Sequence, residues 1–274
     1  DGNGLLVANE GEPNDMYTID PEGSLSYVDL SGGDASALTQ SDVTQINFNA
    51  FESQRATLAA EGVRMFGPNA NLSQDLEPEY IAVSADGTHA MVVLQENNAF
   101  AKVDLTTLAV TDIVAMGMKD YSLGMYDFSD KDDGVNLATY ANVYGMYQPD
   151  AIASYGYNGK TYYITANEGD SRDYDGFSEE FRVKDLQLSE AFGNEAQRKE
   201  LQDKANLGRL KVTSTLGVIN GCDPANKATD VEKDCVFGEL YSYGARSFSI
   251  WNEQGQRVFD SGNDFERITA NLIP

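Results

Sequence analysis

Two acidic loops in this sequence could do chemistry, and they share one pattern. Residues 8–11 and 166–169 both read Ala-Asn-Glu-Gly, and each copy leads to an aspartate, Asp15 or Asp173. A third, looser copy reads Gln-Glu-Asn at residues 95–97. Carboxylate and amide oxygens are the ligands that Ca²⁺ prefers in proteins.

The pattern therefore predicts calcium binding through these loops. The alternative is that the same side chains cap turns and bond to neighbouring strands. The candidate metal ligands are Glu10, Asp15, Glu96, Asn167, Glu168, Asp170 and Asp173.

Three arginines near these loops are candidates for binding an anion. Arg172 lies inside the second copy, Arg64 lies shortly before the Glu-Pro-Glu segment at residues 77–79, and Arg246 opens a strand-like run. A guanidinium beside bound calcium would suit a phosphate group, because its fork of donors matches phosphate oxygens. The alternative is that each arginine forms ion pairs that brace one strand against another.

The single histidine excludes several kinds of enzyme. His89 cannot supply the several imidazoles of a histidine-rich zinc centre, including the two-zinc centre of alkaline phosphatases. No Gly-x-Ser-x-Gly motif accompanies it for a serine hydrolase. We expect His89 to lie on the surface of a strand.

The net charge limits the partners of this chain. Its 19 basic and 44 acidic residues give a formal charge of −25, which repels nucleic acid and anionic membranes. This charge favours solubility, and it also suits binding of hard cations. No apolar run approaches the roughly 18 residues that a membrane span needs.

Two cysteines indicate an oxidising compartment. Cys222 and Cys235 flank a short polar loop, and two thiols alone cannot build a zinc site. We predict a disulfide, with free thiols as the alternative, and hence a location outside the cytoplasm.

The elements that position the acidic loops repeat along the chain. Residues 77–83 and 148–154 share a Pro-acidic-x-Ile-Ala core, each is followed by a turn glycine, and a glutamate follows that glycine after nine residues. Alternating runs at residues 24–30, 99–105 and 107–114 predict further strands, and residues 247–260 predict a hairpin.

This spacing predicts an all-β fold of four-stranded antiparallel blades, a partial β-propeller that occupies residues 1–274 as one domain. By the same register the chain would start in the middle of a blade. Two stretches have helical spacing instead, at about 48–61 and 189–207, and we expect them to be helical insertions between strands.

Four segments together resemble the choice-of-anchor I family of secreted or surface-anchored bacterial β-propellers. They are residues 6–15, residues 67–82, residues 165–174 and residues 246–251. The resemblance implies a propeller with further blades beyond Pro274. Many members of the family carry an alkaline-phosphatase-like label, so it also implies a possible phosphoesterase.

Two functions are therefore expected for an extracytoplasmic protein, whether secreted, periplasmic or anchored to the surface. The first is a calcium-binding propeller that hydrolyses phosphoesters of small molecules by metal-activated water. The second is a surface or adhesion protein without enzymatic activity, in which calcium stiffens loops and the partners are glycans or proteins.

Overall fold

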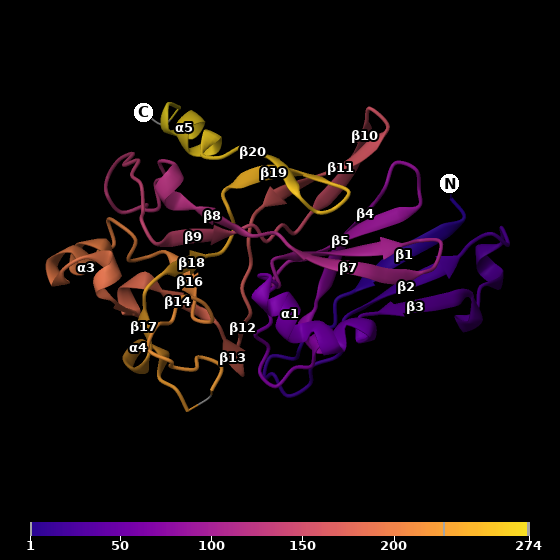
Figure 1. The fold of residues 1–274 in the computed structure, drawn as a ribbon, viewed down its shortest axis with the longest axis horizontal. Helices are drawn as coiled ribbons and strands as arrows, with labels where there is room; N and C mark the ends of the chain where they lie inside the picture. The colour runs from indigo at the N-terminus through magenta and orange to yellow at the C-terminus, as the bar shows by residue number, and fades with distance from the viewer. Residues whose placement is uncertain (1, 227, 273–274) are drawn as a thin grey trace. The chain divides into compact units, whose positions relative to one another are not determined.

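The structure is a computed structural model, and it describes residues 2–226 and 228–272 (Figure 1). Strands form 34% of the chain and helices 18%, so the protein is mostly β rather than all-β. The chain divides into two compact units. Unit 1 comprises residues 1–117, 148–166 and 249–260, and unit 2 comprises residues 118–147, 167–248 and 261–274.

Unit 1 contains three antiparallel sheets. The first has the order β1 (Gly4–Asn9), β2 (Ser24–Asp29), β3 (Val43–Asn47). The second has the order β4 (Pro78–Val83), β5 (His89–Leu94), β6 (Ala99–Asp104), β7 (Ala109–Ala115). The third has the order β10 (Ile152–Tyr157), β11 (Lys160–Asn167), β19 (Ser247–Asn252), β20 (Arg257–Asp260). These sheets confirm the strands that the alternating runs predicted.

Local sequence explains the hairpins of these sheets. Asn158 and Gly159 form a two-residue turn between β10 and β11, and both have positive φ, at 52° and 73°. This is the conformation that tight hairpins require and that Asn-Gly provides at low cost. His89 begins β5 and is exposed, as predicted.

The second sheet is buried on both faces. Ala90, Val92 and Leu94 of β5 share one apolar cluster with Leu25 of the first sheet. On the other face, Phe100 meets Trp251 of the third sheet edge-to-face, with ring centroids 5.1 Å apart. Burial of both faces explains why β5 reads as a continuous apolar run rather than an alternating one.

Unit 2 is built around a five-stranded mixed sheet. Its order is β14 (Glu180–Arg182), β16 (Lys211–Thr213), β18 (Leu240–Ser242), β9 (Val143–Met146), β8 (Met118–Asp120). Two small sheets pair β12 (Asp173–Tyr174) with β13 (Phe177–Ser178), and β15 (Gln187–Leu188) with β17 (Val236–Phe237). Tyr121, Val143, Val212, Phe237 and Leu240 belong to its apolar core.

The helices are short. They are α1 (Arg55–Ala60), α2 (Leu72–Asp75), α3 (Glu195–Leu201), α4 (Val231–Asp234) and α5 (Asp264–Ala270). A 3₁₀ segment, Asn49–Gln54, precedes α1, so the insertion at 48–61 is helical as predicted. The insertion at 189–207 is less helical than predicted, because Gly193 with φ of 93° separates a 3₁₀ turn from α3 and turns follow Leu201.

The prediction of a propeller is not confirmed. The described residues form several small sheets and no closed barrel. In unit 2, β18 pairs parallel with β9, which a four-stranded antiparallel blade does not allow. The strands there are two to four residues long, so their pairing depends on long-range packing rather than on alternation visible in the sequence. Within residues 2–226 and 228–272, no helix has the length and apolar character of a membrane span.

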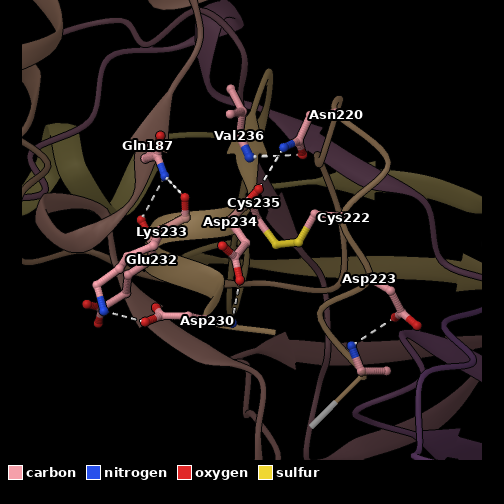
Figure 2. The surroundings of a disulfide bond; sticks show 11 residues. Gln187, Asn220, Cys222, Asp223, Asp230, Glu232, Lys233, Asp234, Cys235 and Val236 are labelled. Carbon is pink, nitrogen blue, oxygen red and sulfur yellow. Dashed lines mark hydrogen bonds and ion pairs between the residues drawn. A yellow bond between two sulfur atoms is a disulfide. The ribbon is translucent and has the colours of Figure 1, made fainter. Parts of the chain in front are cut away.

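Cys222 and Cys235 form the predicted disulfide in unit 2 (Figure 2). Asn220 joins the segment before Cys222 to the backbone on both sides of Cys235. Its Nδ2 donates to the Asp234 carbonyl at 2.7 Å, and its Oδ1 accepts from the Val236 N–H at 3.1 Å. Gln187 donates to the carbonyl of Glu232 at 3.2 Å. The bond from Gln187 therefore holds α4 beside β15, and the disulfide joins Cys222 to the end of α4.

Replacing both cysteines, by Cys222→Ser and Cys235→Ser, should lower the free energy of unfolding by about 3 kcal/mol. The reason is that the unfolded chain regains the freedom of a loop of this length. Urea unfolding with and without dithiothreitol measures the effect. Dithiothreitol should destabilise the natural chain and leave the double variant unchanged. Equal stability of the natural chain and the double variant without dithiothreitol would contradict the prediction.

Candidate functional site

The asparagine of each Ala-Asn-Glu-Gly copy has a structural partner. In unit 1, Asn9 Nδ2 donates to Ser26 Oγ at 2.9 Å and to Ser24 Oγ at 3.3 Å. In unit 2, Asn167 Nδ2 donates to Ser247 Oγ at 2.9 Å. Ser24 begins β2 and Ser247 begins β19, so each asparagine bonds to the first serine of a following strand.

The glycine of each copy is required by a close backbone contact. Gly169 has φ of 86°, and a Cβ on it would lie 1.9 Å from the Gly244 nitrogen. Gly11 has φ of 80°, and a Cβ there would lie 2.8 Å from the Gly23 nitrogen. No side chain fits such spacing, so in both copies one glycine packs on another. Much of the repeated motif is therefore architectural.

The third copy is displaced by one residue in the strand register. Ile81 pairs with Val92, which is four residues before Glu96, whereas Ile152 pairs with Thr165, which is three residues before Glu168. The two hairpins also differ in their turns, with six residues between Val83 and Ala90 and two residues between Tyr157 and Lys160. As a result Glu96 is buried while Glu168 is exposed.

The predicted metal ligands fall into the two units. Glu10, Asp15 and Glu96 lie in unit 1, where Glu10 is half-buried and Asp15 is exposed. Asn167, Glu168, Asp170 and Asp173 lie in unit 2, where Asn167 is buried and the three carboxylates are exposed. Across the described part of the chain, no three His, Cys, Asp or Glu side chains gather in a way that could hold a metal ion. Calcium binding by these residues stays a prediction.

Arg172 lies inside unit 2 rather than on its surface. Its side chain is among the largest that are fully buried, at 1% exposed, and Glu179 beside it is 0% exposed. The backbone N–H of Arg172 donates to Glu179 Oε1 at 3.2 Å, and the Thr213 hydroxyl donates to Glu179 Oε2. In this conformation Arg172 contributes to packing and does not reach a ligand in solution.

Arg64 is also buried, in unit 1. Its Nη1 donates to the Glu96 carbonyl at 2.7 Å, and its guanidinium lies over the Phe66 ring at 4.1 Å. Asn97 Nδ2 in turn donates to the Arg64 carbonyl at 2.9 Å. Arg64 thereby fixes the backbone of the third acidic loop.

Arg246 is the most accessible of the three predicted arginines, with 43% of its side chain exposed. Its Nε is paired with Glu266, and its Nη2 donates to the Asp127 carbonyl at 3.2 Å. Burial lowers the pKa of Arg246, but the hydrogen bond to Glu266 and the negative charge around the guanidinium together outweigh burial, so the pKa is raised. Arg246 and Glu266 line a cavity of about 200 Å³ in unit 2.

A larger cavity of about 410 Å³ lies directly beside the second acidic loop in unit 2. Gly169, Asp170 and Ser171 form part of its lining. The rest comprises Phe128, Glu180, Arg209, Leu210, Lys211 and Tyr243. Its volume lies within the range of small-molecule sites. This cavity is the candidate functional site, because it combines the predicted loop with both signs of charge and two aromatic rings.

Hydrogen bonds order the polar wall of this cavity. Ser171 Oγ donates to Glu180 Oε2 at 3.1 Å, and Lys211 Nζ lies 2.6 Å from Glu180 Oε1. The ladder between β14 and β16 sets Glu180 opposite Thr213, which brings Lys211 within reach. About half of the Lys211 side chain stays exposed, so its ammonium can also meet a ligand.

Arg209 supplies a second cation. Its Nε lies 3.1 Å from Asp130 Oδ1, with 41% of the side chain exposed. The hydrogen bond from Lys131 and the charge of Arg209 lower the pKa of Asp130. No sequence motif marked Glu180, Arg209 or Lys211. The one available signal was two basic residues separated by a single leucine in a strongly acidic chain.

Repeated antiparallel sheets define a β-rich protein, and its disulfide is typical of proteins found outside the cytoplasm. The particular family follows from comparison with known proteins. The family model described as the choice-of-anchor I domain matches residues 1–274, so the chain belongs to that family.

One curated relative is similar to most of this chain. The "Mesenchyme-specific cell surface glycoprotein" of Strongylocentrotus purpuratus is 27% identical over 266 residues, which cover 85% of this chain. The match spans 32% of that relative, about a third of its length. A solved structure, Kuenenia stuttgartiensis hydrazine synthase, matches 58% of this chain and 41% of its own at 15% identity, and its TM-score of 0.18 supports no conclusion about this fold.

The close contact of Gly169 generates a stability prediction. Gly169→Ala should lower the free energy of unfolding by more than about 3 kcal/mol, because the cost of positive φ adds to the cost of the clash with the Gly244 backbone. Gly87→Ala is the matched control: Gly87 also has positive φ, at 74°, but nothing lies within 4 Å of its Cβ position. It should cost about 1 kcal/mol. Urea unfolding measures both, and equal losses would show that the Gly169 contact is unimportant.

Proposed function

We propose that this chain is part of an extracytoplasmic surface protein that recognises a ligand and does not transform it. Three observations support the location. The chain belongs to the choice-of-anchor I family, it contains a disulfide, and a relative carries the name of a cell surface glycoprotein. Disulfides persist in oxidising compartments.

The cavity beside Asp170 carries the proposal of recognition. It joins two exposed cations to two carboxylates and two aromatic rings in a chain whose net charge is −25. In so acidic a protein, Arg209 and Lys211 on one wall form a local site for a ligand carboxylate or sulfate. Phe128 and Tyr243 line the cavity with aromatic surface that a sugar ring can contact, while Asp170 and Glu180 can accept hydrogen bonds from hydroxyl groups.

This combination fits an acidic saccharide such as a uronate. A ring with a carboxylate on one side and hydroxyl groups on the other matches the cations, the acceptors and the aromatic lining together. A phosphorylated small molecule would satisfy the cations and leave the two acidic side chains facing a second negative charge. The geometry therefore favours the glycan among the partners expected from the sequence.

Binding of an oligogalacturonate tests this proposal. Arg209→Gln with Lys211→Gln should weaken binding about tenfold or more, since two charge-assisted hydrogen bonds are lost. Lys199→Gln is the matched control, because Lys199 is exposed on α3 and pairs with Glu195 away from the lining residues. Isothermal titration calorimetry gives the dissociation constants. Equal binding of the methyl-esterified sugar, or an unaffected double variant, would exclude the site.

Calcium binding is a separate proposal, and the exposed carboxylates of the second loop motivate it. Asp170 and Asp173 flank Arg172, whose burial anchors the middle of this loop. An ion bound by these oxygens would stiffen the loop beside the cavity.

The melting temperature should therefore rise in millimolar CaCl₂ relative to EGTA, and Asp170→Asn with Asp173→Asn should remove that rise. Differential scanning calorimetry measures it, with Asp112→Asn on β7 of unit 1 as an exposed control. No difference between CaCl₂ and EGTA would eliminate the calcium proposal. A chromogenic phosphomonoester is added to the same solutions. If the protein hydrolyses it and EGTA abolishes this activity, the proposed function of ligand recognition is wrong and the protein is a hydrolase.

A further inference from the structure

Unit 1 has a cavity of its own, of about 170 Å³, and none of the metal ligands or arginines predicted from the sequence lines it. Its lining comes from the second sheet, from β11 and from the turn between β19 and β20. The volume is below that of sites for drug-sized molecules, so it suits a small metabolite. The lining includes Ser84, Asp86, Met91, Lys102, Tyr163 and Glu253.

Tyr163 forms a buried polar part of this lining. It is 2% exposed, and its hydroxyl makes no hydrogen bond to any residue that the structure describes. Burial and the nearby charges of Glu253 and Asp86 raise the pKa of Tyr163 to about 12, so the hydroxyl keeps its proton in neutral solution. A buried hydroxyl without a partner is costly, and a ligand in the cavity would supply the partner.

Two carboxylates of the lining each bond to the protein through one oxygen. Asp86 Oδ1 accepts from the Ser84 hydroxyl at 2.7 Å and from the Thr88 N–H at 3.1 Å, and these bonds help to lower the pKa of Asp86 to about 2. Glu253 Oε1 accepts from the Thr161 N–H at 2.8 Å. Within residues 2–226 and 228–272, Asp86 Oδ2 and Glu253 Oε2 accept no hydrogen bond, so each can accept from a ligand.

Lys102 brings a positive charge to the same cavity. It is half-buried on β6 and pairs with Met91 of β5, which places both side chains on one face of the second sheet. Its ammonium forms no ion pair with any described carboxylate. In a chain with a net charge of −25, such a lysine is a local site for an anionic group.

We propose that this cavity binds a small zwitterion, an α-amino acid with a short side chain. The ligand ammonium donates to Asp86 and Glu253, its carboxylate accepts from Lys102, and the Tyr163 hydroxyl gains a hydrogen bond to the ligand. A simple anion would face two carboxylates, and a simple amine would leave Lys102 unpaired. Since this cavity shares no lining residue with the one beside Asp170, the proposal is independent of the recognition of an acidic sugar.

Isothermal titration calorimetry with L-alanine tests the proposal. L-lactate replaces the ammonium by a hydroxyl group, and isopropylamine replaces the carboxylate by a methyl group, so each lacks one of the two charges. L-alanine should bind about tenfold or more tightly than either compound. Equal binding of the three compounds, or no binding of L-alanine, would overturn the proposal.

Two charge variants locate the binding. Lys102→Gln and Glu253→Gln should each weaken L-alanine binding about tenfold, and glutamine at position 253 keeps an acceptor for the Thr161 N–H. Lys199→Gln is the matched control, because Lys199 is an exposed lysine of unit 2 outside the lining. Equal affinity of all three variants would place the binding elsewhere and overturn the proposed site.

Tyr163→Phe separates ligand binding from folding, because it removes only the hydroxyl. It should weaken L-alanine binding about fivefold. Without ligand it should leave the melting temperature within about 2 °C of that of the natural chain, since no described residue bonds to the hydroxyl. A lower melting temperature with unchanged affinity would assign Tyr163 to the core alone and overturn the proposed site.

Discussion

The structure depends on a close contact between two glycine backbones at the end of a strand, where the chain turns and no side chain fits. In unit 2 the backbones of Gly169 and Gly244 meet there, and the amide of Asn167 bonds to Ser247 on the neighbouring strand. Gly11, Gly23 and Asn9 repeat this arrangement in unit 1. The repeated Ala-Asn-Glu-Gly motif therefore serves close packing. Only the exposed aspartates that follow it, Asp170 and Asp173, are available for chemistry.

Burial of charge determines what this tail can do. Arg172 and Glu179 lie in the interior of unit 2, and Arg64 lies in the interior of unit 1. Charges removed from water are costly unless polar groups compensate them, and such groups specify local structure more than they supply reactivity. The cations that remain accessible beside Asp170 are Arg209 and Lys211. The proposed recognition of an acidic sugar rests on these exposed groups rather than on the arginines nearest in sequence.

Sequence patterns predicted those parts of the fold that depend on local order. Alternation located β2, β6 and β7, and the spacing of Cys222 and Cys235 located the disulfide. The parallel pairing of β9 with β18 was not predicted, because strands of three or four residues carry little periodicity and their partners are far apart in the chain.

The candidate site was predictable only in part for a related reason. Asp170 belongs to a visible motif, whereas Lys211 reaches the cavity because β16 pairs with β14. The burial of Arg172 was equally hidden, since composition does not reveal which of several charged residues a core encloses. Counting residues also aligned Glu96 with Glu168, whereas the pairing of Ile81 with Val92 and of Ile152 with Thr165 shows that their positions differ by one residue.

The central claim is that the asparagine of the repeated motif holds the fold while its glutamate does not. The most direct measurement is the free energy of unfolding of Asn167→Ala compared with that of Glu168→Gln. The account predicts a loss of about 1 to 3 kcal/mol for Asn167→Ala, because Ser247 would lose its buried partner. It predicts a change within about 0.5 kcal/mol for Glu168→Gln, whose side chain is exposed. A loss for Glu168→Gln that equals or exceeds the loss for Asn167→Ala would contradict it.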